Sequence, residues 1–482
     1  MLTGVNLLLR LAGTSFQVYL SGKIGAEGIG LLQLVMSVGF LAMTAGMAGV
    51  RTATMYLTAE ELGRKRPGNV VWALSGCIVY SVVCSGVIGA VLYLGAPYLA
   101  ERWIGNPATI GAIRLYAAFL PISCLCGVMS GYFTGANRIG ALAAVEVAEQ
   151  FLSMVITMLL LTFWAGRSPP RACMSVIMGS GIGACVTLML LVILRLKERI
   201  PAAPHIPISR RLLRTAVPLA LADDLKTGIS TAENLMVPKR LALFAGTSSP
   251  LAAFGMVTGM VFPVLMFPAA ILYGLAELLI PELARCGAAG SKRRIRYLAH
   301  RSLRVALIYG SMFCGLLYLL ADPLCTILYR SPEAAVYLRR FAILVPVLYC
   351  DAITDAIAKG LGQQKICVLF NIFTSLMDVA LLFILLPRHG MVGYFWSFLI
   401  THLLNFLLSL WLLLKITGLR IRVFVPLLAF FSTALAVWGA SHLQSVFLKA
   451  AAFLIIFGCL LFLLRVLSKE DINWLIGLLY KK

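Results

Sequence analysis

Long apolar runs, interrupted at short intervals by charged and turn-forming residues, dominate the chain. The runs 71–94, 368–386 and 450–464 are apolar or nearly so. Runs of this kind reach or approach the roughly 20 residues that a helix needs to cross the hydrocarbon core of a bilayer. The pattern therefore predicts an all-α polytopic membrane protein.

Charges and turn signals divide the chain into about fourteen candidate transmembrane helices. These cover approximately residues 2–21, 28–57, 70–94, 108–134, 141–165, 172–195, 212–237, 251–281, 301–321, 333–360, 366–386, 391–415, 422–441 and 445–466. Nearly every residue thus lies in a span or a short connection, and no stretch of about 100 residues is left for a soluble catalytic domain. An enzyme acting on soluble substrates is not expected.

Basic residues gather in the connections on one side of the predicted membrane. If the amino terminus is cytoplasmic, the cytoplasmic connections, among them 195–214 and 291–304, hold most of the 41 Lys and Arg residues together with the tail. The positive-inside rule then predicts a multi-pass protein of the cell membrane with both termini in the cytoplasm. The net charge of +22 is explained by these juxtamembrane clusters, which attract membrane lipids, so no nucleic-acid partner is expected.

Cysteine and histidine give no sign of a metal or redox centre. The 12 cysteines are scattered singly through apolar segments, and none of the 5 histidines lies near another in the sequence. Metal sites and disulfide frameworks need such residues in closely spaced sets. We therefore expect neither a metal nor a cofactor.

The chain contains an internal duplication with an offset of 225 residues. That shift places 115–138 over 340–363, and it also places 28–41 over 253–266. The matched positions are Ala117 with Ala342, Pro121 with Pro346, Gly135 with Gly360, and Gly30 with Gly255. One constant offset in two separate regions indicates that the chain consists of two related halves.

The duplication predicts two six-helix lobes with the same orientation in the membrane. We expect an N-terminal lobe over 1–200, a C-terminal lobe over 201–416, and two additional helices with a cytoplasmic tail over 417–482. Parallel repeats are typical of transporters whose substrate site lies between the halves near the bilayer midplane. The alternative is a duplicated scaffold without transport.

The helix that opens the second half carries an unusual number of polar residues. On a helical wheel, Asp223, Lys226, Thr227, Ser230, Glu233 and Asn234 share one face, with Asp224 at its edge. A charge near the bilayer centre costs roughly 2.5–3.5 kcal/mol, so this face needs polar partners or a hydrated cavity. Asp223 and Lys226 can pair at i,i+3. Two interpretations stay open: a cavity wall, or a structural ion-pair network that locks helices together.

The helix that opens the first half has a similar polar face, formed by Thr3, Asn6, Arg10, Gly13, Thr14, Gln17 and Ser21. We expect both faces to line one central cavity, where Arg10 pairs with Glu233 or an aspartate when no ligand is bound. Glu277 follows a proline-broken segment, whereas Asp355 and Lys359 are expected to form a structural pair. The candidate substrate-binding residues are Asn6, Arg10, Thr14, Gln17, Arg51, Asp223, Asp224, Lys226, Ser230, Glu233, Asn234 and Glu277.

Two segments, "GKIGAEGIGLLQL" (22–34) and "SGYFTGANRIGALAAVEVAEQ" (130–150), carry a family resemblance together with the fourteen-span layout. They resemble the stage V sporulation protein B-like branch of the multidrug, oligosaccharidyl-lipid and polysaccharide (MOP) flippase superfamily, over nearly the whole chain. The resemblance implies a V-shaped pair of lobes like that of MATE transporters. It also implies movement of a peptidoglycan precursor across the cytoplasmic membrane, for the spore cortex in the sporulation branch.

In lipid II flippases of this superfamily, arginines on the first helix are thought to contact the diphosphate of the lipid substrate. By the resemblance, Arg10 matches one such arginine, whereas Phe16 stands where another is expected. The leading interpretation is thus a non-enzymatic flippase for a lipid-linked oligosaccharide with a diphosphate headgroup. Arg10, Arg51 and Lys226 would contact that headgroup. Cell-wall synthases are candidate partners.

The main alternative is a cation-coupled multidrug exporter of the same superfamily. Asp223, Asp224 and Glu233 would then bind sodium or protons and exchange them for cationic drugs. Such exporters typically place an acid on the first helix, where this chain has Arg10, so the flippase is favoured. Coupling to Na⁺, H⁺ or the membrane potential stays open. A membrane enzyme would need a long exposed loop or a cluster of acid, base and nucleophile, which the sequence lacks.

Overall fold

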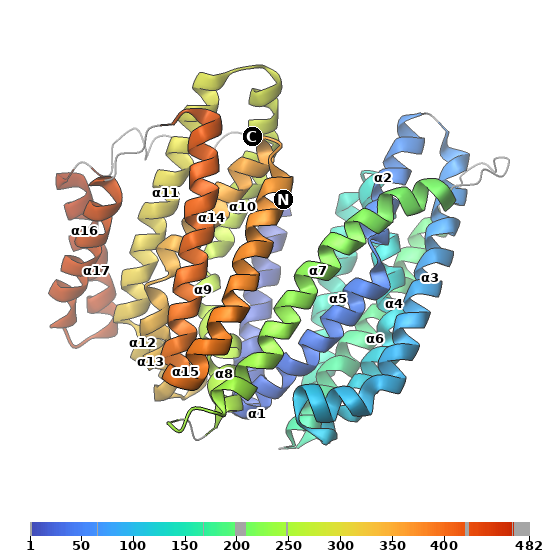
Figure 1. Cartoon of the computed structure of the whole chain (residues 1–482), viewed down its shortest axis with the longest axis horizontal. Helices are drawn as coiled ribbons and strands as arrows, with labels where there is room; N and C mark the ends of the chain where they lie inside the picture. Colours follow the sequence, from blue (N-terminus) through green and yellow to red (C-terminus); the bar gives the residue numbers. More distant parts are fainter. Residues whose placement is uncertain are drawn as a thin grey trace. The chain divides into compact units, whose positions relative to one another are not determined.

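The computed structural model describes residues 2–64, 66–166, 168–197, 209–246, 249–419, 424–464 and 466. Within these ranges the chain forms helices and short connections, and no β-strand (Figure 1). The first eight helices are α1 (Leu2–Met47), α2 (Val50–Gly63), α3 (Pro67–Tyr98), α4 (Ile110–Gly135), α5 (Ile139–Leu160), α6 (Pro169–Leu196), α7 (Ser209–Leu241) and α8 (Pro250–Met256). The others are α9 (Phe262–Met266), α10 (Ala269–Ala288), α11 (Lys292–Leu319), α12 (Ala321–Tyr329), α13 (Pro332–Ala342), α14 (Val345–Gly360), α15 (Gln364–Thr417), α16 (Phe424–Ser441) and α17 (Val446–Leu463).

Residue contacts divide the chain into two compact units. The first comprises Met1–Ala242 with Ser248–Gly255, and the second comprises Leu243–Thr247 with Met256–Lys482. This division differs from the boundary between the sequence repeats at one helix. Although α7 opens the second repeat, it packs against α1, α2 and α3 of the first unit.

The number of apolar helices agrees with a protein that crosses the membrane many times. Nine helices of the described chain are long and apolar enough to span a bilayer, or eleven if each of two bent helix pairs counts as one span. The two longest, Leu11–Gly63 and Gln364–Thr417, each contain two of the expected spans. These spans are separated by left-handed glycines, Gly25 with φ 72° and Gly390 with φ 57°. With α7 added, the architecture is consistent with fourteen spans.

Three of the expected spans are not continuous helices. The span expected over 28–57 is interrupted between α1 and α2. The span expected over 251–281 is the proline-broken series from α8 to α10, bent by 60°, and the span expected over 333–360 is divided into α13 and α14, which are bent by 53° relative to each other. Proline accounts for part of this bending because it cannot donate the helical hydrogen bond and clashes with the preceding turn.

The two repeats pack in the same way. Gly135 of α4 lies against α2, where an added Cβ would come within 2.5 Å of the Met55 carbonyl oxygen. Gly360 of α14 lies against α10, where an added Cβ would come within 2.9 Å of the Ile280 carbonyl oxygen. Both the glycines and their neighbours are related by the offset found in the sequence. Small residues at helix crossings allow such close backbone contact in membrane proteins.

The two additional helices extend the second unit. In Figure 1, α16 and α17 lie side by side, and both pack against α11. Their shared core includes Phe453 and Phe457, whose rings stack at a centroid distance of 5.5 Å. Thr433 of α16 also donates a hydrogen bond to the Ser311 carbonyl oxygen of α11 over 3.4 Å.

Candidate functional site

The break between α1 and α2 organises the polar site of the first unit. Ala48 and Gly49 both adopt left-handed backbone angles, with φ of 43° and 70°, so the helix ends at Met47 and a new one starts at Val50. A Cβ on Gly49 would come within 2.4 Å of the Ala216 carbonyl oxygen. The close approach of α7 therefore requires glycine here, and it brings two helix ends and α7 together at one place.

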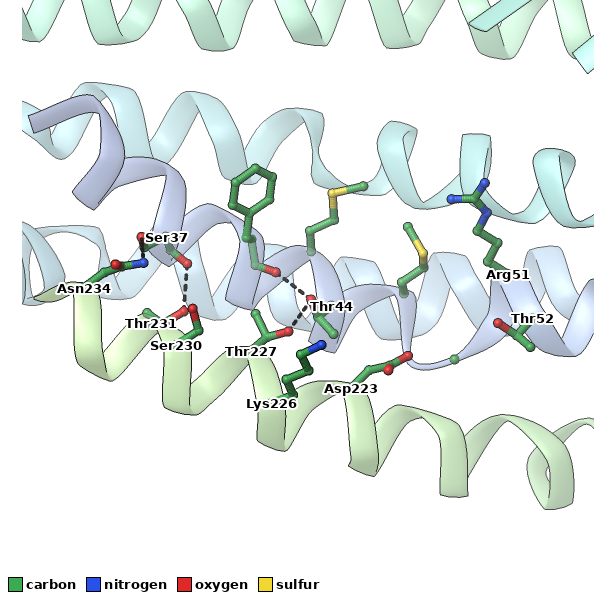
Figure 2. Close-up of a pocket in the computed structure, with 14 residues that line it drawn as sticks. Ser37, Thr44, Arg51, Thr52, Asp223, Lys226, Thr227, Ser230, Thr231 and Asn234 are labelled. Carbon is green, nitrogen blue, oxygen red and sulfur yellow. Dashed lines mark hydrogen bonds between the residues drawn. The ribbon is translucent and has the colours of Figure 1, made fainter. Parts of the chain in front are cut away.

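A cavity of about 550 Å³ lies at this place, between α1, α2 and α7 of the first unit (Figure 2). Its wall carries two cations, Arg51 and Lys226, and one acid, Asp223. Most of the remaining polar wall consists of hydroxyl groups. The full lining is Ser37, Phe40, Met43, Thr44, Met47, Gly49, Arg51, Thr52, Asp223, Lys226, Thr227, Ser230, Thr231 and Asn234.

Hydrogen bonds join α1 to α7 along one edge of the cavity. The Asn234 amide donates to the Ser37 hydroxyl over 3.0 Å, and the Thr231 hydroxyl donates to the Ser37 carbonyl oxygen over 3.1 Å. Thr44 and Thr227 lie 3.4 Å apart through their hydroxyl oxygens, as Figure 2 shows. Part of the polar face of α7 thus holds two helices together, because polar groups in a membrane find partners on neighbouring helices.

The charged groups of the cavity are loosely held. The Arg51 guanidinium lies 4.0 Å from a carboxylate oxygen of Glu146 on α5, and the two side chains are 56% and 42% exposed. Lys226 forms no ion pair within the described part of the chain, so the expected pair with Asp223 is not formed. Both side chains are exposed, and an i,i+3 pair in such a setting gains only a few tenths of a kcal/mol over hydration.

Two family models and two known proteins match this chain. Residues 1–225 match the family described as "Polysaccharide biosynthesis protein", and residues 218–384 match MatE. Stage V sporulation protein B of Bacillus subtilis (strain 168) is 23% identical over 98% of this chain and 96% of its own length. Sporulation protein YkvU of the same organism is 20% identical over 76% of this chain and 82% of its own length.

Solved structures share the fold over most of their length. The lipid II flippase MurJ in an inward closed conformation covers 95% of this chain and 97% of its own, with a TM-score of 0.71 and 12% identity. An inward-facing multidrug resistance MATE family transporter of the MOP superfamily covers 86% of this chain and 98% of its own, with a TM-score of 0.69 and 14% identity. The chain therefore shares its fold with a transporter of the MOP superfamily and with a lipid II flippase. It is a multi-pass membrane protein that is similar to stage V sporulation protein B over nearly the full length of both chains, and the two solved structures are those of a transporter and a flippase.

The cavity of the first unit brings together part of the candidate set. Arg51, Asp223, Lys226, Ser230 and Asn234 line it. Among the described side chains, Thr14, Gln17, Asp224, Glu233 and Glu277 are outside its lining.

Two of the candidates outside the cavity differ in their surroundings. Asp224 is half-buried and lies near Tyr80 of α3, whereas Glu277 is exposed on α10 in the second unit. The side chains of Asn6 and Arg10 lie outside the part of the chain that the structure describes, so a pair between Arg10 and Glu233 stays a prediction.

Several lining residues were not among the candidates. Ser37, Phe40, Thr44 and Met47 follow each other at helical spacing on α1, and Ser37 and Thr44 contact α7 through hydrogen bonds. The spacing is visible in the sequence, but serine and threonine are common in apolar spans, where they bond to their own helix. Thr44 does so as well, donating to the Phe40 carbonyl oxygen over 2.8 Å.

Two other expectations concern sites elsewhere. The structural pair expected in α14 is confirmed, since the Lys359 ammonium lies 2.5 Å from an Asp355 carboxylate oxygen. Among the described residues, no group of three or more His, Cys, Asp and Glu side chains is arranged to hold a metal ion.

Proposed function

We propose that this protein moves a lipid-linked oligosaccharide or peptidoglycan precursor across the cytoplasmic membrane without modifying it chemically. The full-length likeness to stage V sporulation protein B and the fold shared with a lipid II flippase support this proposal. The observation that carries it is the cavity of the first unit, which combines two cations with a wall of hydroxyl and amide groups.

The cavity chemistry suits the headgroup of such a lipid. A diphosphate is anionic, and arginine binds phosphate oxygens through a planar fork of donors whereas lysine acts as a point charge. Arg51 and Lys226 supply one of each, and Thr52, Thr227 and Ser230 offer hydroxyls that can bond sugar hydroxyls. The volume of about 550 Å³ falls within the range of roughly 300–1,000 Å³ typical of small-molecule sites, enough for part of a headgroup while the lipid tail stays in the bilayer.

The transport cycle forms part of the proposal. We infer alternating access by rocking of the two halves, with both termini in the cytoplasm, as parallel repeats and the placement of basic residues favour. Cell-wall synthases acting on the delivered precursor are proposed partners, with sporulation as the setting suggested by the relatives' names. Movement would be driven by Na⁺, H⁺ or the membrane potential, and Asp223 supplies a carboxylate of the cavity wall for a coupling cation.

A cation-coupled multidrug exporter is the second candidate. The MatE match over 218–384 and the carboxylate of Asp223 in the cavity favour it. A cavity with two cations and one acid nevertheless repels a cationic drug more than it attracts one, because like charges in a partly desolvated site interact strongly. The charge balance thus favours an anionic headgroup.

The test is lipid movement in proteoliposomes that contain a fluorescent lipid-linked precursor. Arg51→Gln and Lys226→Gln should each slow transbilayer movement by about 10- to 100-fold, since a hydrogen bond to a charged group is worth about 1.5–3 kcal/mol. Arg114→Gln is the control: Arg114 packs on the ring of Tyr93 at 5.1 Å and does not line the cavity. Equal rates in all three variants would refute the assigned headgroup site. Efflux of a cationic dye without lipid movement would favour the exporter.

A further inference from the structure

A second large cavity lies in the second unit, in a groove between α11, α14, α15 and α16. It has a volume of about 690 Å³. Its lining is apolar except for His300 and Arg304 toward one end and Ser311 toward the other. The apolar wall is built by Leu303, Leu307, Pro346, Val347, Cys350, Phe406, Leu410, Leu419, Val425, Pro426, Leu427 and Phe430.

The groove has the length of one membrane leaflet. Its α11 wall runs from His300 to Ser311, and eleven residues at 1.5 Å per residue give about 16 Å. This is about half of the roughly 30 Å hydrocarbon core of a bilayer. The groove is also reached from the lipid side, because Leu427 and Phe430 of α16 line it and are 61% and 59% exposed.

Positive charge is concentrated at one end of this groove. Arg304 lies there, and its guanidinium donates to the Val466 carbonyl oxygen. The first turns of α11 continue from this end with exposed basic residues, Lys292, Arg293, Arg294 and Arg296. Arg294 pairs with Glu282 at 2.6 Å, which leaves the collar strongly cationic as a whole. A basic collar next to an apolar groove matches a molecule with an anionic head and an apolar chain.

We propose that this groove binds an anionic phospholipid of the leaflet at the basic end of α11, with one acyl chain along α11 and α16 and the phosphate beside Arg304 and His300. The lipid would fill the space between α16 and the bundle and hold the additional helices on α11. The groove shares no residue with the cavity of the first unit, so this site is separate from the proposed headgroup site.

Native mass spectrometry of the purified full-length protein tests this site, with phosphatidylglycerol, phosphatidylcholine and undecaprenyl phosphate as probes. The protein should retain phosphatidylglycerol in preference to phosphatidylcholine. Arg304→Gln should weaken this retention about fivefold, the effect expected for one cation at a membrane surface. Arg388→Gln is the matched control, because it removes the same charge from an exposed position of α15 that belongs neither to the groove nor to the basic collar.

Because Arg304 also holds the Val466 carbonyl, a second variant tests the groove itself. Val347→Trp fills the groove without removing a charge, and it should abolish retention of the first bound phospholipid. Equal losses in Arg304→Gln and Arg388→Gln, or full retention in Val347→Trp, would overturn the proposal. Retention of undecaprenyl phosphate but not phosphatidylglycerol would also overturn it, by assigning the groove to a transported lipid. None of these readouts depends on flipping, so they are independent of the proposed function.

Discussion

The pair α2 and α4 in the first unit and the pair α10 and α14 in the second are packed alike but differ in chemistry. Gly135 meets the Met55 carbonyl oxygen, and Gly360 meets the Ile280 carbonyl oxygen at the corresponding positions. The residue of α2 that reaches the cavity is Arg51, whereas α10 has the buried Ala276 at the matching position. Duplication has kept the small residues where backbones touch, and the side chains that give a ligand its contacts have diverged.

The polar residues of the two units also differ in their exposure and in their hydrogen-bond partners. In the first unit, Arg51 and Lys226 are exposed in a cavity. In the second unit, the buried carboxylate of Asp378 accepts hydrogen bonds from Ser397 and Thr401 over 2.5 and 3.2 Å. In the same unit, the Asn405 side-chain amide donates a hydrogen bond to an Asp351 carboxylate oxygen over 2.9 Å. Buried polar groups with such partners hold helices together, whereas exposed ones in a cavity can meet a ligand.

Reversing one charge in each unit should give the largest difference in the rate of lipid movement. Arg51→Glu should slow lipid movement by roughly 100-fold or more, because it removes a charge-assisted contact worth about 1.5–3 kcal/mol and adds repulsion of the diphosphate. Glu277→Lys reverses an exposed charge on the corresponding helix α10, outside the cavity, and should change the rate by no more than about threefold. Initial rates in proteoliposomes measure both. Similar losses in the two variants would remove the proposed difference between the units.

Removing the buried acceptor of the second unit should affect stability. Asp378→Leu leaves the Ser397 and Thr401 hydroxyls without their carboxylate acceptor, which should lower the free energy of unfolding by about 1–3 kcal/mol. Ser153→Ala alters the matching position of the first unit, where the hydroxyl lies 3.5 Å from that of Ser180, and should cost less than about 0.5 kcal/mol. Thermal unfolding in detergent compares the two. A variant at Asp378 as stable as the parent would contradict a structural role.

The two repeat glycines should tolerate alanine unequally. The added methyl of Gly135→Ala would lie 2.5 Å from the Met55 carbonyl oxygen, and overpacking of this kind costs about 1–3 kcal/mol. In Gly360→Ala the corresponding distance is 2.9 Å, and the better helix propensity of alanine, up to about 1 kcal/mol, offsets more of the cost. We expect a lower melting temperature for both variants, with the larger decrease for the first. The reverse order would show that the packing at the two positions is not equivalent.

The smallest effect concerns the partner of Arg51. Glu146→Gln removes a carboxylate that competes with a phosphate for the guanidinium, so the apparent KM for the lipid should fall by up to about fivefold with the maximal rate unchanged. The bound follows from the roughly 0.2–1 kcal/mol typical of exposed ion pairs. Glu60→Gln is the control, because Glu60 forms an exposed pair with Arg64 at 2.7 Å outside the cavity. A fall in the maximal rate instead would assign Glu146 a different role.

The sequence predicted the spans and the polar face of α7 because both depend on local patterns. Apolar run length marks the helices, and helical spacing places Asp223, Lys226 and Ser230 on one side. The break at Ala48 and Gly49 was not predicted, since a left-handed alanine leaves no compositional signal. Asp224 was placed at the edge of the polar face, and its position near Tyr80 depends on how α3 packs on α7. Such tertiary contacts cannot be read from the spacing within one helix.

The packing of α7 on the first unit has a consequence for how the protein is made. A ribosome that has completed the first repeat has not yet synthesised Asp223, Lys226 or the rest of the wall that α7 contributes. The close packing of Gly49 against the Ala216 carbonyl oxygen also forms only after α7 has been synthesised. The cavity is therefore completed only after the second repeat has begun to insert. If the chain were divided at the repeat boundary into two polypeptides, α7 on the second would have to join the first to rebuild the site, which makes the repeats obligate partners in assembly.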